Sequence, residues 1–171
     1  MDIGILGTGT VGQTIGSRLV ELGHNVRMGS RTADNANARA WAQAGKDRAS
    51  HGTFDSAAAF GEILFNCTSG KGTLSAIDSI KTVNVNDKVL VDVANPLDFS
   101  HGFPPVLTVC NYDSLGEQIQ HERPLLRVVK ALNTMNVEVM VHPQRIRGHH
   151  DVFICGNDKD AKSLVTMILI E

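Results

Sequence analysis

The residues of this chain with the clearest chemical signature are three glycines near its start. Gly7, Gly9 and Gly12 follow the pattern G-x-G-x-x-G within the segment GTGTVG. In this pattern the first glycine permits a tight turn, the second lets the backbone approach a pyrophosphate, and the third lets a helix pack closely on a strand. The free N–H groups at the start of such a helix attract phosphate, aided by the helix dipole. Residues 7–12 are therefore predicted to bind a dinucleotide.

The neighbours of this motif decide between a nucleotide site and an ordinary glycine-rich turn. An apolar run at residues 3–6 precedes the glycines, and apolar residues at helical spacing follow between positions 10 and 22. A strand before the glycines and a helix after them is the arrangement that supports dinucleotide binding. We therefore interpret the motif as a nucleotide site.

The pair Ser30-Arg31, at the end of the next apolar run, indicates which dinucleotide is bound. NAD enzymes usually place an acidic residue here for the ribose 2′-hydroxyl, whereas NADP enzymes carry basic groups. The first acidic residue after this run is Asp34. A hydroxyl and a guanidinium suit a 2′-phosphate, and charge-assisted bonds of about 1.5–3 kcal/mol each would favour NADP over NAD by ~100-fold or more. The alternative, which can hold together with the first, is that Ser30 caps a surface helix.

Other side chains with possible chemistry carry weaker signals. His142, His149 and His150 lie in a polar stretch in which no cysteine or glutamate completes a ligand set, so we predict no metal site. No general acid is predicted either, and the catalytic residues are left unassigned.

One cysteine and two lysines lie near the predicted cofactor path. Cys67 is interpreted as a small packing residue rather than a reactive thiol. Lys71 lies in SGKGT, which lacks the spacing of a phosphate-binding P-loop, so it is at most a basic residue near the mouth of the site. Lys130, at a strand end, is expected to form an ion pair or hydrogen bond rather than to act in catalysis.

The composition limits the class of protein. The 171 residues are 42% hydrophobic and 20% charged, with a formal net charge of −2. This describes an ordinary globular chain with no general attraction to nucleic acid or acidic membranes. No secretory signal or membrane-spanning stretch is visible. Three scattered cysteines (Cys67, Cys110 and Cys155) read as reduced thiols, so we expect a cytoplasmic protein without nucleic-acid or membrane partners.

The elements that must position these residues alternate between strand and helix. Apolar runs predict strands at residues 3–6, 25–28, 63–66, 89–92, 127–130 and 152–155. Apolar periodicity or alanine content predicts helices at residues 10–22, 33–44, 55–59 and 158–170, with Asp55 as the N-cap of the third. Residues 95–113 contain three prolines and are predicted to form a loop. This alternation predicts an α/β fold of the Rossmann type, a doubly wound and mostly parallel sheet with helices on both faces.

A combination of segments, rather than any one motif, resembles a known protein family. The chain contains, in order, IGILGTGTVGQTIGSRLVELGHNVRMGSR, NCTSG, VDVANPLD, VVKALNTMN and VFICGNDKDAKSLV. Together they resemble the coenzyme F420-dependent NADP oxidoreductase family, which includes the NADPH-binding reductase domains of the STEAP metalloreductases. The resemblance spans nearly the whole chain. It implies hydride transfer between NADP(H) and a deazaflavin (F420) or flavin-type acceptor.

The resemblance also implies which residues bind. The predicted cofactor-binding residues, for the pyrophosphate, the 2′-phosphate and the nicotinamide, are Gly7, Thr8, Gly9, Thr10, Val11, Gly12, Ser30, Arg31, Thr68, Ser69, Ala94 and Asn95. The predicted substrate-binding residues, beside the nicotinamide, are Pro96, Asn133, Thr134 and Met135. Each stretch follows a predicted strand, and ligands of open α/β sheets bind outside the carboxyl ends of the strands. Asn95 and Asn133 are candidates to orient a carboxamide or ring carbonyl, and Met135 to form an apolar wall.

Several family-level expectations follow from the same resemblance. Relatives often carry a lysine near Asn35, and Arg39 is the candidate substitute in this chain. The family normally continues with a further strand and a closing helix, so residues 1–171 are expected to form a single NADP(H)-binding domain that lacks them, and a homodimer is expected. Two alternatives to the F420 or flavin oxidoreductase are an NADPH-dependent flavin and metal reductase and a non-catalytic NADP(H) sensor.

Overall fold

Six short strands form one sheet in which every neighbouring pair is parallel. The computed structural model describes residues 1–171, and the strand order is β3-β2-β1-β4-β5-β8. The strands are β1 (Asp2–Leu6), β2 (Asn25–Ser30), β3 (Ala49–Thr53), β4 (Ile63–Asn66), β5 (Val89–Asp92) and β8 (Arg127–Lys130). The order reverses direction between β1 and β4, which is where open α/β sheets bind ligands.

The strands are apolar on both faces because helices cover both sides of the sheet. Ile3 and Ile5 of β1 belong to one buried cluster, whereas the next residue along, Leu6, belongs to the other. The same alternation separates Phe65 from Leu64 on β4. A parallel sheet needs helical crossovers, and the crossovers bury both of its faces.

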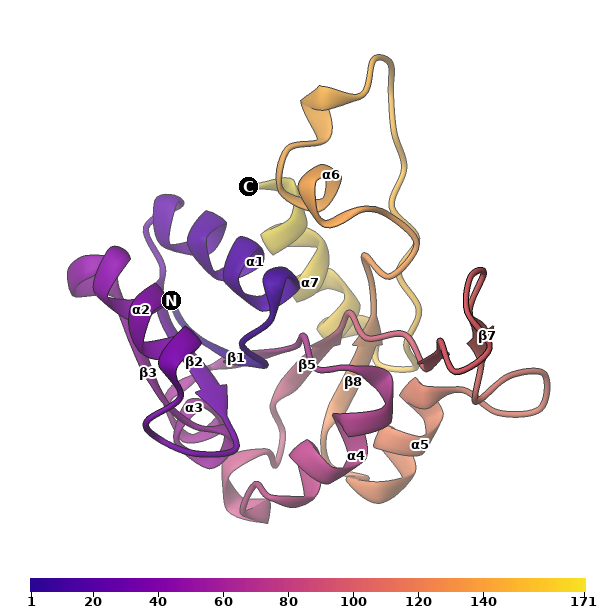
Figure 1. Ribbon diagram of the computed structural model, residues 1–171, viewed down its shortest axis with the longest axis horizontal. Coiled ribbons are helices and arrows are strands. Elements are labelled where there is room, and N and C mark those ends of the chain that lie inside the picture. The colour runs from indigo at the N-terminus through magenta and orange to yellow at the C-terminus, as the bar shows by residue number, and fades with distance from the viewer.

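The helices divide between these two faces (Figure 1). One face packs against α1 (Thr10–Glu21), α2 (Ala36–Ala44), α6 (Val137–Val141) and α7 (Lys159–Ile170). The other packs against α3 (Phe54–Phe60), α4 (Gly70–Asp78) and α5 (Leu115–Glu122). The predicted doubly wound α/β architecture is therefore confirmed. No helix of the structure is both long enough and apolar enough to cross a membrane.

The predicted strand at residues 152–155 is wrong. The segment meets β8 only through an isolated antiparallel bridge, in which Lys130 and Cys155 exchange backbone hydrogen bonds of 2.7 and 3.0 Å. Val152 and Phe153 are exposed, and only Cys155 of this segment pairs with the edge strand. An apolar run alone does not show whether its backbone pairs with a neighbouring strand.

Two helix starts also differ from the prediction. The helix expected at 33–44 begins at Ala36, since Asn35 caps it by accepting a hydrogen bond from Ala38 N at 3.1 Å. The next helix, α3, is capped by Thr53 instead of Asp55. Asp55 lies in its first turn and accepts hydrogen bonds from Lys81 N (2.9 Å) and Asn84 Nδ2 (2.7 Å), which hold its pKa below the usual value.

Some elements give no clear signal in the sequence. Strand β3 reads ASHGT and helix α5 reads LGEQIQHE, and neither was predicted. The predicted loop at 95–113 contains a two-stranded hairpin, β6 (Leu97–Asp98) with β7 (Val106–Leu107). This hairpin and the segment after α6 project from the layered core in Figure 1. The hairpin pairs only two residues on each strand, so its sequence shows little apolar periodicity.

Candidate functional site

A polar cleft of about 530 Å³ opens at the carboxyl ends of β1, β2 and β4. Its lining includes seven of the residues predicted to bind the cofactor, namely Gly7, Thr8, Gly9, Ser30, Arg31, Thr68 and Ser69. Thr32, Asn35, Phe54 and Cys67 complete it. Phe54 was not foreseen, because it follows β3, the strand that the sequence did not reveal. The cleft is the position that a dinucleotide takes in this architecture.

The three glycines of the motif have three distinct surroundings at this cleft. Gly7 has a φ of 121°, a conformation that side-chain-bearing residues rarely adopt. A Cβ atom on Gly9 would meet nothing within 4 Å, so this stretch of backbone faces open space. A Cβ on Gly12 would lie 2.3 Å from the Gly7 carbonyl oxygen, so only glycine lets α1 pack this close to β1. These geometries match the role of each glycine in a dinucleotide motif.

The first turn of α1 presents free hydrogen-bond donors to the cleft. Gly9 caps this helix without a side-chain hydrogen bond, and the first turn contains no acidic residue. The N–H groups of Thr10, Val11 and Gly12 donate no hydrogen bond within the chain. Gln13 Nε2 donates to the Thr8 carbonyl oxygen at 2.8 Å and braces the preceding turn. The helix dipole and these donors together suit a phosphate group.

The Ser30-Arg31 pair lies at the edge of the cleft, with the two side chains in different environments. Ser30 is buried, and its hydroxyl donates to the Thr32 carbonyl and lies 3.4 Å from the Gly52 carbonyl oxygen. Arg31 is exposed and makes no hydrogen bond or ion pair within the chain. The serine hydroxyl therefore fixes the turn, and the guanidinium is free to meet an anion.

The alternative interpretation of Ser30 as a helix cap does not hold, because Asn35 caps α2. Asn35 also lines the cleft, although its Oδ1 atom is engaged with the helix. Arg39, the candidate substitute for the lysine of relatives, is exposed on α2 and is not part of the lining.

A second, mostly apolar pocket of about 300 Å³ continues from the polar cleft. Cys67 and Thr68 line both spaces and so join them. The other residues of the pocket are Val11, Val93, Ala94, Asn95, Leu97, Asn133, Met135, Val137 and Met140. The polar cleft and the apolar pocket form one surface that runs from Arg31 to Met135 across the point where the strand order reverses.

The predicted residues near the apolar pocket differ in their placement. Ala94, Asn95, Asn133 and Met135 line it, whereas Pro96 and Thr134 do not. Asn95 Nδ2 donates to the Asn133 carbonyl oxygen at 2.7 Å. In return, Asn133 Nδ2 donates to Asn95 Oδ1 at 3.2 Å. The two amides thus hold the loops after β5 and β8 together, so they shape the pocket before any ligand enters.

A chain of buried polar groups lies beneath these loops. Asp92 is fully buried and forms an ion pair with Lys130, with 2.8 Å between Oδ2 and Nζ. Asn66 Nδ2 donates to Asp92 Oδ1 at 2.7 Å, and Thr68 Oγ1 donates to Asn66 Oδ1 at 2.7 Å. Thr73 Oγ1 lies 2.9 Å from Thr68 Oγ1 and completes the network. Its members come from β4, β5, β8, α4 and the loop between β4 and α4, so it ties the ends of three neighbouring strands together.

Cys67 behaves as the sequence indicated, whereas Lys71 does not line the cleft and has a partner outside it. Burial, with a smaller contribution from the charge of Asp92, raises the pKa of the Cys67 thiol far above its usual value, so this thiol is not a nucleophile at neutral pH. Lys71 forms an ion pair with Asp98 at 2.7 Å. This hydrogen bond and two from Ser100 lower the pKa of Asp98 to about 2.

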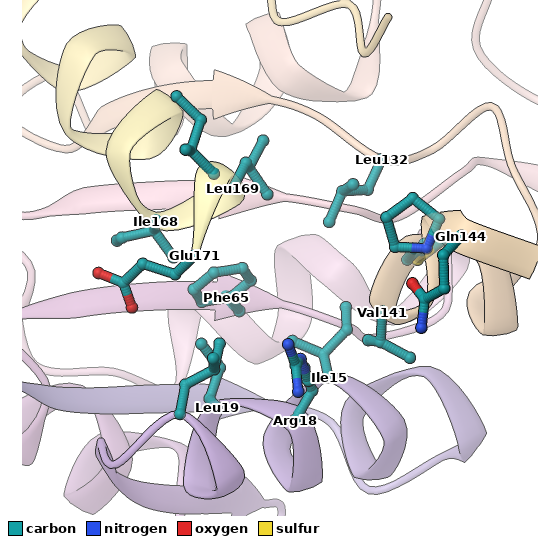
Figure 2. Close-up of a pocket in the computed structure, with 14 residues that line it drawn as sticks. Ile15, Arg18, Leu19, Phe65, Leu132, Val141, Gln144, Ile168, Leu169 and Glu171 are labelled. Atoms are coloured by element: carbon teal, nitrogen blue, oxygen red, sulfur yellow. The ribbon is translucent and has the colours of Figure 1, made fainter. Parts of the chain in front are cut away.

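A separate cavity of about 270 Å³ lies between α1, α6 and α7, with Phe65 of β4 at its base (Figure 2). Ten of its 14 lining residues are hydrophobic, and none of the 14 is a predicted site residue. It lacks the free backbone donors and the glycine turn of the cleft. The polar cleft and the joined apolar pocket are therefore the candidate nucleotide site.

The histidines of the segment after α6 lie in a different setting. His149 and His150 are exposed, and His150 Nε2 lies 2.8 Å from the Ile146 carbonyl oxygen. No group of three or more His, Cys, Asp or Glu side chains in the structure is arranged to hold a metal ion.

Comparison with known proteins finds a matching family and several similar solved structures. Residues 2–96 match the family model for "NADP oxidoreductase coenzyme F420-dependent". A candidate F420-dependent NADP reductase from Arthrobacter sp. FB24 has 43% sequence identity and a TM-score of 0.89, and the match covers 98% of this chain and 78% of the Arthrobacter chain. The family match ends just after β5, so it includes the whole polar cleft.

More distant solved structures share the fold alone. The hypothetical protein SMa0349 from Sinorhizobium meliloti is 19% identical with a TM-score of 0.79, and the match covers 99% of this chain and 79% of that one. An NADP-bound pyrroline carboxylate reductase from Plasmodium falciparum is 12% identical with a TM-score of 0.63, covering 99% and 54% of the two chains. No curated protein matches the chain.

Proposed function

Because the chain belongs to the family of coenzyme F420-dependent NADP oxidoreductases, and is thus an NADP-dependent oxidoreductase, we propose that it transfers a hydride between NADP(H) and a deazaflavin or flavin-type acceptor. The observation that carries the proposal is the continuous surface from the polar cleft to the apolar pocket. One end offers a guanidinium and free helix N–H groups. The other offers an apolar wall on which flat rings can stack.

Each part of this surface has a physical role in the proposal. The pyrophosphate lies against Gly9 and the first turn of α1, where three N–H groups are free and a Cβ is absent. Arg31 pairs with the 2′-phosphate of the adenosine ribose. The nicotinamide enters the apolar pocket, where Met135 and Val11 exclude water from its ring. Between the two ends, Thr68 lies along the cofactor.

The proposed reaction requires little acid–base catalysis by the protein. NADPH supplies a hydride, and its transfer requires that donor and acceptor rings be held close together and dry. The reciprocal Asn95–Asn133 pair holds the two loops of the pocket in fixed positions. The Cys67 thiol remains protonated and contributes only bulk to the lining. The proposed chemistry thus rests on positioning rather than on an ionised catalytic side chain.

Anaerobic oxidation of NADPH by the purified chain tests this function. F420, FMN and FAD are offered in parallel, and absorbance at 340 nm reports turnover. We expect turnover with the deazaflavin, and Gly9→Ala serves as a control that keeps the fold but obstructs the pyrophosphate position. Turnover with flavins alone would favour the alternative of an NADPH-dependent flavin and metal reductase, whereas tight NADPH binding without turnover on any acceptor would favour the sensor.

A further inference from the structure

The ion pair between Asp92 and Lys130 lies directly behind the apolar pocket. Asp92 is the last residue of β5 and is fully buried, whereas the side chain of Lys130, the last residue of β8, is 22% exposed. Asp92 Oδ1 also accepts a hydrogen bond from Ala94 N at 3.2 Å, and Lys130 Nζ donates to the Ala94 carbonyl oxygen. Both charges thus hold the same residue, Ala94, which lines the pocket.

The field of Asp92 reaches the wall of the pocket. Cys67 lines both the pocket and the polar cleft, and the charge of Asp92 contributes to the raised pKa of its thiol. Water is excluded around Asp92, so bulk solvent screens its charge weakly. Lys130 is the cation in contact with this carboxylate, and it cancels much of the field.

A nicotinamide ring responds to such a field according to its redox state. The ring carries a positive charge in NADP⁺ and none in NADPH. A net negative charge behind the pocket therefore favours the oxidised form, and a net positive charge favours the reduced form. A balanced pair leaves the two affinities close to each other, which suits a hydride transfer that runs in either direction.

We propose that Lys130 sets the relative affinity of the site for NADP⁺ and NADPH by neutralising Asp92. Lys130 is then a specificity-determining residue for the redox state of the cofactor, not a catalytic residue. The inference rests on the proposed function, because it requires the nicotinamide to occupy the apolar pocket. It assigns the ion pair a role that purely structural packing would not require.

Dissociation constants for NADP⁺ and NADPH, measured by calorimetry at pH 8 on folded variants, test the inference. Asp92→Asn leaves the positive charge of Lys130 without a partner, so it should raise the ratio Kd(NADP⁺)/Kd(NADPH). We expect a rise of about three- to tenfold, which is the effect of one weakly screened charge acting over roughly 10 Å. Lys130→Gln keeps a hydrogen-bond donor but leaves the negative charge of Asp92 without a partner, so it should lower the ratio by a similar factor. The double variant should restore the ratio of the unmodified chain.

A neutral control separates charge from structure. Thr73→Val removes a buried member of the same network without changing a charge, so it should weaken both redox forms equally and leave the ratio unchanged. Ratios that stay constant in both charge variants, or that move in the same direction, would overturn the inference. If Asp92→Asn does not fold, the ratio measured for Lys130→Gln tests the inference by itself, because the Lys130 side chain is partly exposed. Failure of the unmodified chain to bind either nucleotide would instead refute the proposed function.

Discussion

At the scale of single residues, Arg31 is the side chain on which the choice between NADP and NAD depends most. Its guanidinium is exposed, unpaired and part of the cleft lining. Arg31→Ala should weaken NADP⁺ binding about 10- to 100-fold, since a charge-assisted bond contributes about 1.5–3 kcal/mol. NAD⁺ binding, which involves no 2′-phosphate, should change little.

Isothermal titration with both nucleotides checks this expectation. Arg39→Ala is the matched control, because Arg39 is also an exposed arginine but lies on α2 outside the cleft. Equal losses of NADP⁺ and NAD⁺ affinity in Arg31→Ala would contradict the assigned role.

Cys67 differs from the other two cysteines in its expected reactivity. Burial and the nearby Asp92 charge raise the pKa of its thiol, whereas Cys110 and Cys155 are exposed. At pH 8 we expect iodoacetamide to modify the two exposed cysteines first and Cys67 last. Peptide mass spectrometry over a time course measures the order. Modification of Cys67 as early as that of the exposed cysteines would contradict the raised pKa of its thiol.

Asp98 gives a pH-dependent prediction at the same scale. Its pKa in the folded chain is about 2, because Lys71 and Ser100 donate hydrogen bonds to the carboxylate. A carboxyl group with a lowered folded-state pKa stabilises the fold above its unfolded value of 3.8, and this contribution disappears as the pH falls toward 2. Carboxyl-carbon NMR titration should find the low pKa, and Lys71→Met should raise it toward 3.8.

At the scale of elements, the start of α1 separates binding from stability. Gly9 has a φ of −78° and open space where a Cβ would lie, so Gly9→Ala should leave the melting temperature nearly unchanged and strongly weaken NADPH binding. Gly12→Ala would place a methyl group 2.3 Å from the Gly7 carbonyl oxygen and should destabilise the fold by about 1–3 kcal/mol.

Thermal unfolding and nucleotide titration of these two variants measure both properties side by side. The contrast between them is the informative result, because both are the same chemical change within one motif. A loss of stability in Gly9→Ala comparable to that in Gly12→Ala would mean that the open space at Gly9 is not available to a ligand.

At the scale of the whole molecule, ligand binding and folding stability are linked. A ligand that binds only the folded state at 100 times its Kd adds about 2.7 kcal/mol, which is roughly 5–10 °C in melting temperature for a chain of this size. We expect this shift with NADP⁺. NAD⁺ at the same concentration, with a Kd ~100-fold weaker, should add only about 0.4 kcal/mol. Differential scanning calorimetry distinguishes the two, and equal shifts would contradict the predicted NADP preference.

The expected homodimer also belongs to this scale and stays a prediction. Sedimentation velocity of the purified chain would give a mass near twice 18.4 kDa if it holds. A single species at 18.4 kDa would remove it.

The sequence by itself determined the features that depend on local interactions. The glycine turn, the strand before it and the helix after it are encoded within residues 2–21, because turn geometry and apolar periodicity act over a few residues. The two-sided burial of a parallel sheet was readable for the same reason. Lys130 was correctly predicted to be a pairing residue, although its partner was not.

Only the tertiary structure decided which distant side chains meet. Asp92 lies 26 residues from Asn66 and 38 from Lys130 in the sequence. The three side chains come together because parallel strands place their carboxyl ends at the same end of the sheet. The Asn95–Asn133 pair, also 38 residues apart, forms at the same end. The tertiary structure likewise decides that, of residues 152–155, only Cys155 exchanges backbone hydrogen bonds with β8. Strand register and sheet order, which no local pattern encodes, therefore place the charges behind the pocket.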